Sequence, residues 1–378
     1  MFLHHRHAAP LIRRRTAVLV SLTLLATSSA HAQDFSQMFA VSGFGTVGMT
    51  HNSSALGDYV SDVFQANGAG YTRRSAFGVD SKAAMQLDAK VTDQLSAVLQ
   101  VVSRSRVNTA FLPRVEWANV KYAITPELSV RVGRVAMPTF MNSETRLVGY
   151  ANPWIRPPIE TYSLRSTTNS DGVDGAWRHA FGSVNNTVQA WYGKMEVASV
   201  GSTGGVSNGV RAEKIIGIAD SAEIGSLTVR AAVTKIDFRL NGAAGTFIYS
   251  PANVYSAGFN YDPGTYFVLG ELTKSDFGTV QRAQKAGYLT GGYRFNKFTP
   301  YITYSKVDVD DDQTRLSLRA QHSVAGGLRW DFRKDFALKV QLDKVQLEPL
   351  SNGFFTNAKA GMAGSSAKVL SATVDFVF

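Results

Sequence analysis

The strongest constraint on the fold of this 378-residue chain is a two-residue alternation of apolar and polar side chains. The clearest example is the C-terminus, where one face carries Leu370, Ala372, Val374, Phe376 and Phe378 and the other carries Ser371, Thr373 and Asp375. The same period predicts strands in six further stretches, namely 77–88, 227–233, 255–261, 289–296, 323–331 and 336–343. Successive side chains of a strand point to opposite faces, so this period indicates an all-β chain of two-faced strands.

The composition supports a large sheet rather than helices or disorder. The chain is 44% hydrophobic and 18% charged, with 33 glycines and no cysteine, which excludes a disordered chain, a coiled coil and a disulfide scaffold. After the N-terminal region, no segment approaches the roughly 20 apolar residues of a membrane-spanning helix.

The first 32 residues have the pattern of a cleaved export signal. Arg13, Arg14 and Arg15 precede the short apolar run 16–26, and Ala30-His31-Ala32 fits a cleavage site. Maturation at Gln33 would leave residues 33–378 with 35 basic and 29 acidic residues. That excess is too small to indicate nucleic-acid binding. The three remaining histidines are too scattered to predict a metal site, and nothing else in the sequence calls for a cofactor.

Short and long connections alternate along the mature chain. Seven short turns are predicted at 92–94, 125–127, 181–183, 221–225, 262–264, 296–297 and 333–335. Eight longer connections are predicted at 51–75, 105–113, 136–170, 198–213, 240–251, 275–285, 308–319 and 348–366. Fifteen connections join 16 strands, and short turns on one side with long loops on the other are typical of a transmembrane antiparallel β-barrel.

Periodicity alone does not separate such a barrel from a soluble sandwich, because it does not say whether the apolar face points in or out. Sixteen strands are many for one sandwich, and aromatic residues gather near the predicted strand ends as a membrane-interface girdle requires. These residues are Tyr122, Tyr261, Phe295, Phe298, Phe332, Phe336, Phe376 and Phe378. A barrel of 16 strands does not fill its own interior and encloses an aqueous channel.

The export signal, the terminal Phe378 and the stretch Ser129 to Tyr162 (SVRVGRVAMPTFMNSETRLVGYANPWIRPPIETY) resemble Gram-negative outer-membrane porins. In porins of this kind, a strand that ends like Gly133-Arg134 leads into a third long loop, which folds into the barrel and narrows it. In this chain that loop would be 136–170. Pro153, Pro157 and Pro158 would make that insert rigid, although an external cap is the alternative. The resemblance also implies a homotrimer embedded in outer-membrane lipid.

A constriction of opposed charges is the predicted functional site. The loop would contribute Glu144, Arg146, Arg156, Glu160 and Arg165, and the barrel wall Arg131, Arg294, Arg329 and Lys339, together with Arg104 and Arg134. Arg134 is out of phase with Arg131 and reaches the lumen only if its strand has already ended. A local basic excess would favour anions. Alternatively, the basic residues pair with carboxylates such as Glu144, Glu160, Asp343 and Asp375 and stiffen the loop.

The leading functional hypothesis is a passive diffusion channel for small hydrophilic solutes, without catalysis. One alternative is a lipase-like barrel enzyme in which one of the three remaining histidines, His51, His179 or His322, activates a serine near the membrane edge. Another is an adhesive surface barrel. The stretch Gly43 to Gly48 matches a dinucleotide-binding pattern, but no helix is expected after it. Small residues in a first strand explain this match better.

Overall fold

The computed structural model describes residues 38–106, 111–163, 168–200, 206–241, 247–278, 281–310 and 319–378. The two short helices are η1 (Gly149–Ala151) and α2 (Ile159–Tyr162). The strands are β1 (Phe39–Asn52), β2 (Ser75–Ala76), β3 (Lys82–Lys90), β4 (Leu95–Arg104), β5 (Arg114–Ala123), β6 (Leu128–Ala136), β7 (Asn169–Phe181), β8 (Val184–Val200), β9 (Val206–Ile224), β10 (Leu227–Asn241), β11 (Phe247–Tyr261), β12 (Tyr266–Phe277), β13 (Gln281–Tyr293), β14 (Phe298–Val309), β15 (Gln321–Arg333), β16 (Phe336–Leu347) and β17 (Ser366–Val377). Within these residues, no helix has the length and apolarity needed to cross a membrane.

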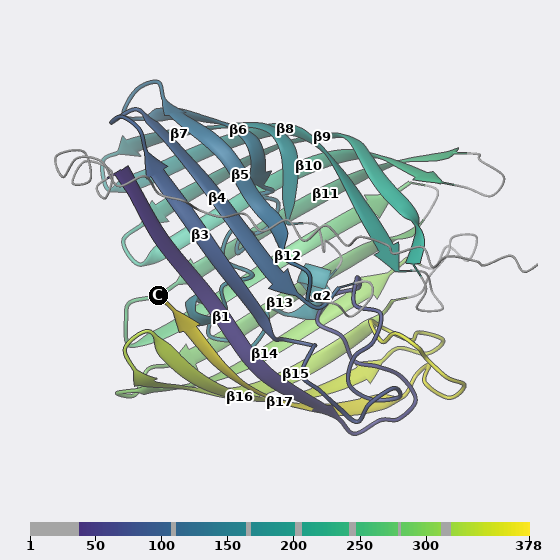
Figure 1. Cartoon of the computed structure of the whole chain (residues 1–378). Helices are drawn as coiled ribbons and strands as arrows, with labels where there is room; N and C mark the ends of the chain where they lie inside the picture. Colours follow the sequence, from purple (N-terminus) through teal and green to yellow (C-terminus); the bar gives the residue numbers. More distant parts are fainter. Residues whose placement is uncertain are drawn as a thin grey trace, which may run out of the picture. The chain divides into compact units, whose positions relative to one another are not determined.

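The strands of the unit 38–378 form one closed antiparallel ring. From β3 to β17 each strand pairs with the next along the chain, and β1 closes the ring by pairing with both β3 and β17. The two-residue β2 only flanks β1, so the barrel has 16 strands. The predicted fold is therefore confirmed, and all 15 predicted connections occur in the predicted order. Figure 1 shows the oblique strands, with the start of β1 and the C-terminus at the same end.

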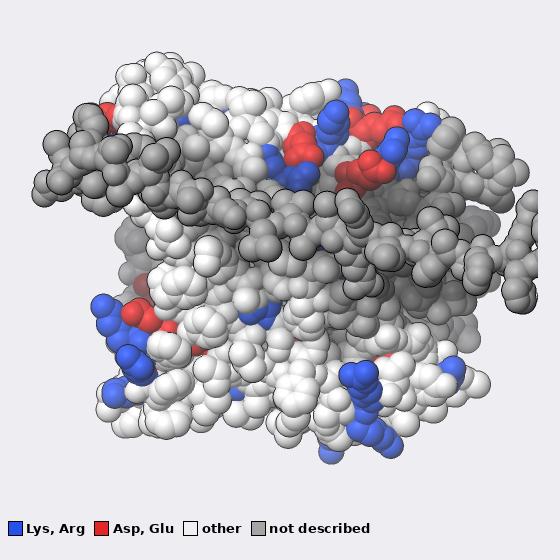
Figure 2. All heavy atoms as spheres, in the orientation of Figure 1, with Lys and Arg blue, Asp and Glu red and all other residues white. Residues whose placement is uncertain are grey.

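The burial pattern of the sheet is inverted relative to a soluble protein. In β14, Ile302 and Tyr304 are 62% and 49% exposed, whereas the intervening Thr303 is 3% exposed. Strands throughout the ring repeat this pattern, with large apolar side chains on the outward face and polar side chains on the inward face. Neutral side chains cover most of the described surface in Figure 2, and charged side chains lie in separate patches.

Aromatic rings gather at the end of the barrel that carries the short turns. Phe298 stacks on Trp330 with ring centroids 5.8 Å apart, and Phe336 stacks on Phe376 at the same separation. Phe332 links these two pairs, with its ring 5.6 Å from that of Trp330 and 6.2 Å from that of Phe336. This row of rings agrees with an interfacial girdle, because aromatic side chains favour the boundary between lipid and water.

The first strand closes on the last through small residues. Gly43 exchanges backbone hydrogen bonds of 2.9 and 3.0 Å with Phe378. A Cβ atom at Gly43 would lie 2.3 Å from the Phe378 ring, and one at Gly45 would lie 2.3 Å from the Phe376 ring. The glycines that match the dinucleotide pattern therefore make room for the C-terminal aromatic rings.

Two details of the sequence prediction are wrong. The predicted strand at 77–88 begins only at Lys82, because residues 77–81 leave the sheet and turn into the barrel with Asp80. The predicted long connections at 198–213 and 240–251 are shorter in the structure, because strands β8 to β11 continue into them.

Candidate functional site

The connection between β6 and β7 forms most of the candidate site. Its described part, residues 137–163, is called the β6–β7 segment below and contains η1 and α2. It makes hydrogen bonds with side chains on the inward face of strands β10 to β17 and β1. These partners include Thr50, Thr234, Ser256, Glu271, Thr290, Thr303, Ser305, Gln321, Ser323, Lys339, Gln341 and Ser371. The segment therefore lies against the polar face of half of the ring.

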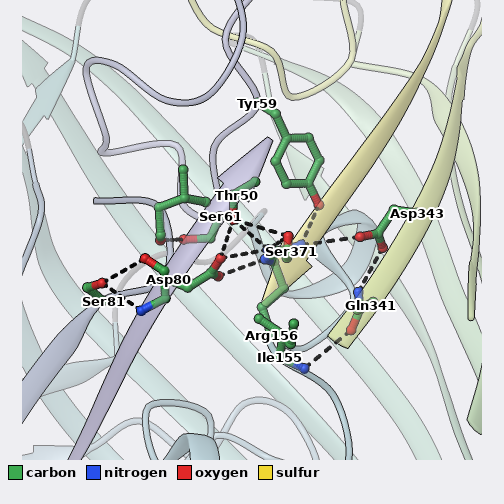
Figure 3. A network of polar contacts seen from close by, with 12 residues as sticks. Thr50, Tyr59, Ser61, Asp80, Ser81, Ile155, Arg156, Gln341, Asp343 and Ser371 are labelled. Atoms are coloured by element: carbon green, nitrogen blue, oxygen red, sulfur yellow. Dashed lines mark hydrogen bonds and ion pairs between the residues drawn. The ribbon is translucent and has the colours of Figure 1, made fainter. Parts of the chain in front are cut away.

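Arg156 is at the centre of the densest polar network (Figure 3). Its Nε and Nη2 atoms donate to the two Asp80 oxygens at 2.8 and 2.6 Å, and Nη1 lies 3.3 Å from Asp343 Oδ2. Nη2 also donates to Ser371 Oγ at 2.6 Å, and the guanidinium lies 5.2 Å from the centre of the Tyr59 ring. One buried cation thus connects the β6–β7 segment with the β1–β3 connection and two strands.

The two ions at the centre of this network stabilise each other's charge. Burial by itself would raise the pKa of the Asp80 carboxyl, but the attraction and hydrogen bonds of Arg156 outweigh burial and hold that pKa below its ordinary value. Burial opposes the charge of Arg156 too, yet Asp80 raises the pKa of the guanidinium well above its ordinary range. The pair therefore stays charged at neutral pH.

Lys339 and Asp375 form a second buried ion pair, next to η1 of the segment. Both side chains are 0% exposed, and Lys339 Nζ lies 2.9 Å from Asp375 Oδ2. The ammonium also donates to the backbone oxygens of Gly149, Asn152 and Trp154 at 2.7, 2.7 and 2.9 Å. An ammonium has three protons to donate, so Lys339 holds the turn around η1 against β16 through these three hydrogen bonds.

The distal part of the segment is held by hydroxyl and amide donors. Glu160 accepts hydrogen bonds from Ser305 Oγ at 2.8 Å, from Gln321 Nε2 at 2.7 Å and from Ser323 Oγ. Trp154 Nε1 lies 3.0 Å from Thr290 Oγ1. The Glu160 carboxylate and the Trp154 ring are both buried, and each has a polar partner, as buried polar groups require.

The half of the ring opposite the segment, called the open side below, has a cavity of its own. This cavity of about 480 Å³ lies against β3 to β6, and its mixed lining includes the polar side chains of Gln86, Asp88, Asn119, Lys121 and Arg131. Lys121 and Arg131 are register partners on β5 and β6. Among the residues that the structure describes, Lys121 has no ion pair.

Arg131 links this open side to the segment. Its Nε donates to Asp174 Oδ1 at 2.8 Å, and its Nη2 lies 3.3 Å from Glu144 Oε1. The side chains of Arg131 and Glu144 are 27% and 51% exposed. This contact is thus far more accessible to water than the Arg156 network.

Three other predicted residues also contact inward groups. Arg146 is buried and donates to the Tyr162 backbone oxygen at 3.2 Å, within the segment itself. Arg104 pairs with Asp62 of the β1–β3 connection at 2.9 Å. Arg329 donates to the Tyr150 backbone oxygen at 2.7 Å.

Arg294 lies nearer the short-turn end and pairs with Asp262 at 2.6 Å. Arg294 and Arg329 both line a cavity of about 520 Å³ on the segment's short-turn side.

The placement of Arg134 in a constriction needs correction. Arg134 occupies the outward face of β6, two residues after the exposed Val132, and pairs there with Asp171 at 2.7 Å. The strand continues to Ala136, so its phase is not interrupted before Arg134. Arg165, the remaining predicted residue, lies outside the described residues.

Sequence reasoning missed Asp80, Asp174 and the hydroxyl side chains that receive the segment. Asp80 looks like an ordinary polar residue of an alternating strand, and its role depends on the chain turning inward at 77–81. Asp174 alternates with outward residues such as Val173, so the phase of β7 could have assigned it to the lumen. Within the described residues, no group of three or more His, Cys, Asp or Glu side chains is arranged to hold a metal ion.

No protein-family model matches the sequence, and no curated protein matches it. Solved structures do match the fold. The outer membrane channel DcaP of Acinetobacter baumannii is 13% identical with a TM-score of 0.59, and the match covers 90% of this chain and 98% of that one. The anion-selective porin from Comamonas acidovorans is 13% identical with a TM-score of 0.57, over 90% of this chain and 100% of that one.

Salmonella typhi OmpF, in complex with daunomycin, is also 13% identical with a TM-score of 0.57, over 90% and 97% of the two chains. The barrel has the fold of bacterial outer-membrane porins. At this level of identity the likeness concerns the fold, and it agrees with the family that the sequence resembles.

Proposed function

We propose that this protein is an outer-membrane porin, a passive diffusion channel for small hydrophilic solutes. The observation that carries the proposal is the closed 16-stranded ring with an apolar outward face and a polar inward face. Such a ring needs lipid around it and water within it. The β6–β7 segment acts as an inward-folded third loop that narrows the lumen against β10 to β17, and solutes pass along the opposite side.

A mild preference for anions follows from the charges on that open side. The buried cations Arg156 and Lys339 are matched by carboxylates, so they contribute little net field. Lys121 has no such partner among the described residues, whereas Arg131 beside it is paired with Asp174 and Glu144. A difference of about 1.4 kcal/mol in ion partitioning corresponds to a tenfold preference, so one unbalanced lysine supports a several-fold effect.

Planar-bilayer recording tests both parts of the proposal. We expect discrete conductance steps from the purified, folded protein, and a reversal potential in a KCl gradient with the sign of anion preference. Folded protein that inserts without conductance would contradict the channel. A reversal potential of the opposite sign would contradict only the anion preference.

The assembly and maturation of the protein are part of the same proposal. The solved structures similar to this chain include a trimer form of Vibrio cholerae OmpT, 11% identical with a TM-score of 0.53 over 90% and 100% of the two chains, and we expect a homotrimer here. We also expect residues 1–32 to be removed on export. The mass of the protein extracted from membranes by detergent tests both points, because it gives the number of copies and the first residue.

The enzyme alternative has less support from the geometry. His179 Nδ1 lies 3.8 Å from Glu127 and its ring stacks on Trp177, while His322 Nδ1 lies 3.1 Å from Glu348. Each of these two histidines therefore contacts a carboxylate, but a nucleophilic mechanism also needs a serine hydroxyl at the other ring nitrogen. His51 shows the converse: its Nδ1 lies 2.9 Å from Ser75 Oγ, but it has no ion pair with a carboxylate among the described residues. Ester hydrolysis that is lost in His179→Ala or His322→Ala would favour the enzyme.

A further inference from the structure

An open groove runs along the outward face of β11 to β14. Its volume is about 640 Å³, and its floor and sides are mainly apolar. The lining includes the exposed side chains of Tyr255, Leu272, Leu289 and Tyr304, with Ala257 at one side. These residues belong to the face that we assign to lipid, so the groove would be filled by an acyl chain rather than by water.

Three lysines surround the groove where its apolar lining ends. Lys274, Lys285 and Lys306 all line it, on the side where the strands lead into the predicted long connections. Lys274 and Lys285 are register partners on β12 and β13. Lys306 pairs with Asp308 at 2.9 Å, but neither Lys274 nor Lys285 has an ion pair with any residue that the structure describes.

Asp308, the register partner of Lys285 on β14, pairs with Lys306 and supplies one carboxylate beside the three lysines. Like charges directly opposite each other on neighbouring strands are destabilising. The aliphatic part of a lysine side chain can lie along an apolar surface while its ammonium group reaches the head-group layer of the membrane. Anionic head groups attract such lysines. Three positive charges against one carboxylate, directly beyond an apolar groove, are complementary to an anionic amphiphile.

We propose that this groove binds one phosphorylated lipid, with an acyl chain along Leu272 and Leu289 and the phosphate between Lys274 and Lys285. The inference rests on the proposed membrane location, since only there does the groove meet lipid. The bound lipid would fix the position of the barrel in the membrane without entering the lumen.

Lipid retention by the full-length, detergent-purified protein tests this proposal. Native mass spectrometry would compare dioleoylphosphatidic acid with dioleoylphosphatidylcholine, and we expect the phosphomonoester lipid to bind at least tenfold more tightly. The double variant Lys274→Gln/Lys285→Gln should lose most of that preference. Its matched control is Lys297→Gln/Lys334→Gln, which removes two exposed lysines at the short-turn end and should retain it.

A second variant separates the acyl chain from the phosphate. Ala257→Phe would fill the groove from its outward face and should weaken lipid binding several-fold, while free inorganic phosphate should compete poorly in every variant. Equal retention of phosphatidic acid by wild type and the double variant would overturn the proposal. So would equal binding of the two lipids by wild type, or loss of the oligomer rather than of the lipid in the double variant.

Single-channel conductance distinguishes this inference from the proposed function. None of these substitutions faces the lumen, so each variant should conduct like wild type. Absence of conductance in all forms, wild type included, would defeat the porin proposal while lipid retention could still be measured.

Discussion

The two halves of the barrel interior differ in how far their charged side chains are buried and paired. Against β10 to β17, the β6–β7 segment buries Arg156 and Lys339 with carboxylate partners and a full set of hydrogen bonds. Against β3 to β6, Lys121 and Arg131 face a cavity, and the contact of Arg131 with Glu144 is exposed to water. In the first half, paired charges hold a segment in place, and in the second half charged side chains remain accessible to water.

The comparison teaches that charged residues in a barrel interior do not all tune selectivity. A buried pair is neutral as a unit and acts through geometry, whereas removing one partner leaves an uncompensated ion and destabilises the fold. An exposed lysine contributes little to stability and much to the local potential. Variants on the two sides should therefore have opposite effects on stability and on current.

The largest effect is expected for Asp80→Ala. Arg156 would lose the partner of its two shortest carboxylate hydrogen bonds while remaining buried, so the free energy of unfolding should fall by about 3–5 kcal/mol. Denaturant unfolding in detergent measures it. The matched control is Asp262→Ala, which breaks the more exposed pair with Arg294 and should cost about 0–1 kcal/mol. Similar losses in both variants would remove the distinction between buried and exposed pairs.

Gly149→Val should have the next largest effect. A Cβ atom there would lie 2.3 Å from Asp375 Oδ1 and 2.7 Å from Thr46 Oγ1, so the segment must move away from Lys339. We expect a loss of about 1–3 kcal/mol in the free energy of unfolding and a change in single-channel conductance.

Gly326→Ala is the control for this variant, because nothing lies within 4 Å of the added Cβ. Wild-type conductance and stability in Gly149→Val would show that the segment is not held at this point.

Acidification should lower the stability of the half of the barrel interior that the β6–β7 segment occupies. The pKa of Asp80 is lowered by Arg156, so the pair contributes its full stability above the ordinary carboxyl pKa of about 4 and loses it as the pH falls through the lowered value. Unfolding midpoints measured between pH 2 and 7 should therefore fall at the acidic end. Asp80→Asn should show a shallower fall over that range, and an unchanged slope would assign the acid sensitivity to other groups.

The smallest change in stability, with a clear change in current, is expected for Lys121→Glu on the open side. Reversing this charge should shift the permeability ratio several-fold toward cations and leave stability within about 0.5 kcal/mol of wild type. The reversal potential in a KCl gradient measures it. Lys334→Glu, in a turn outside the lumen, should leave the ratio unchanged, and an equal shift in both variants would assign selectivity to the overall charge.

Much of the fold could be predicted from sequence because alternation is a local property. Stretches such as 370–378 show their two faces directly, and turn residues such as Asp335, with a φ of 65°, mark the connections. Strand length was harder to predict. The sequence 198–213 contains four glycines and three serines, so the continuation of β8 and β9 into this range depends on backbone pairing that the side-chain pattern does not reveal.

The site was predictable only in part. Which side chains are buried, and which residues they pair with, depends on parts of the chain that are far apart in the sequence. The alternative in which the basic residues pair with carboxylates such as Asp343 and Asp375 named acceptors that the structure pairs with Arg156 and Lys339, without saying which meets which. The role of Asp80 depends on residues 77–81 leaving the sheet, and no pattern in the sequence indicates that. For Arg134, by contrast, the sequence pattern was informative, because its phase relative to Arg131 already indicated the outward face.

Thiol accessibility tests the central claim most directly, because the chain contains no native cysteine. In lipid bilayers, a membrane-impermeant sulfonated thiol reagent should react with Lys121→Cys and reduce its current. The same reagent should leave Leu289→Cys unlabelled, since that side chain faces lipid. Rapid labelling of Leu289→Cys with protection of Lys121→Cys would contradict an apolar exterior around a water-filled lumen.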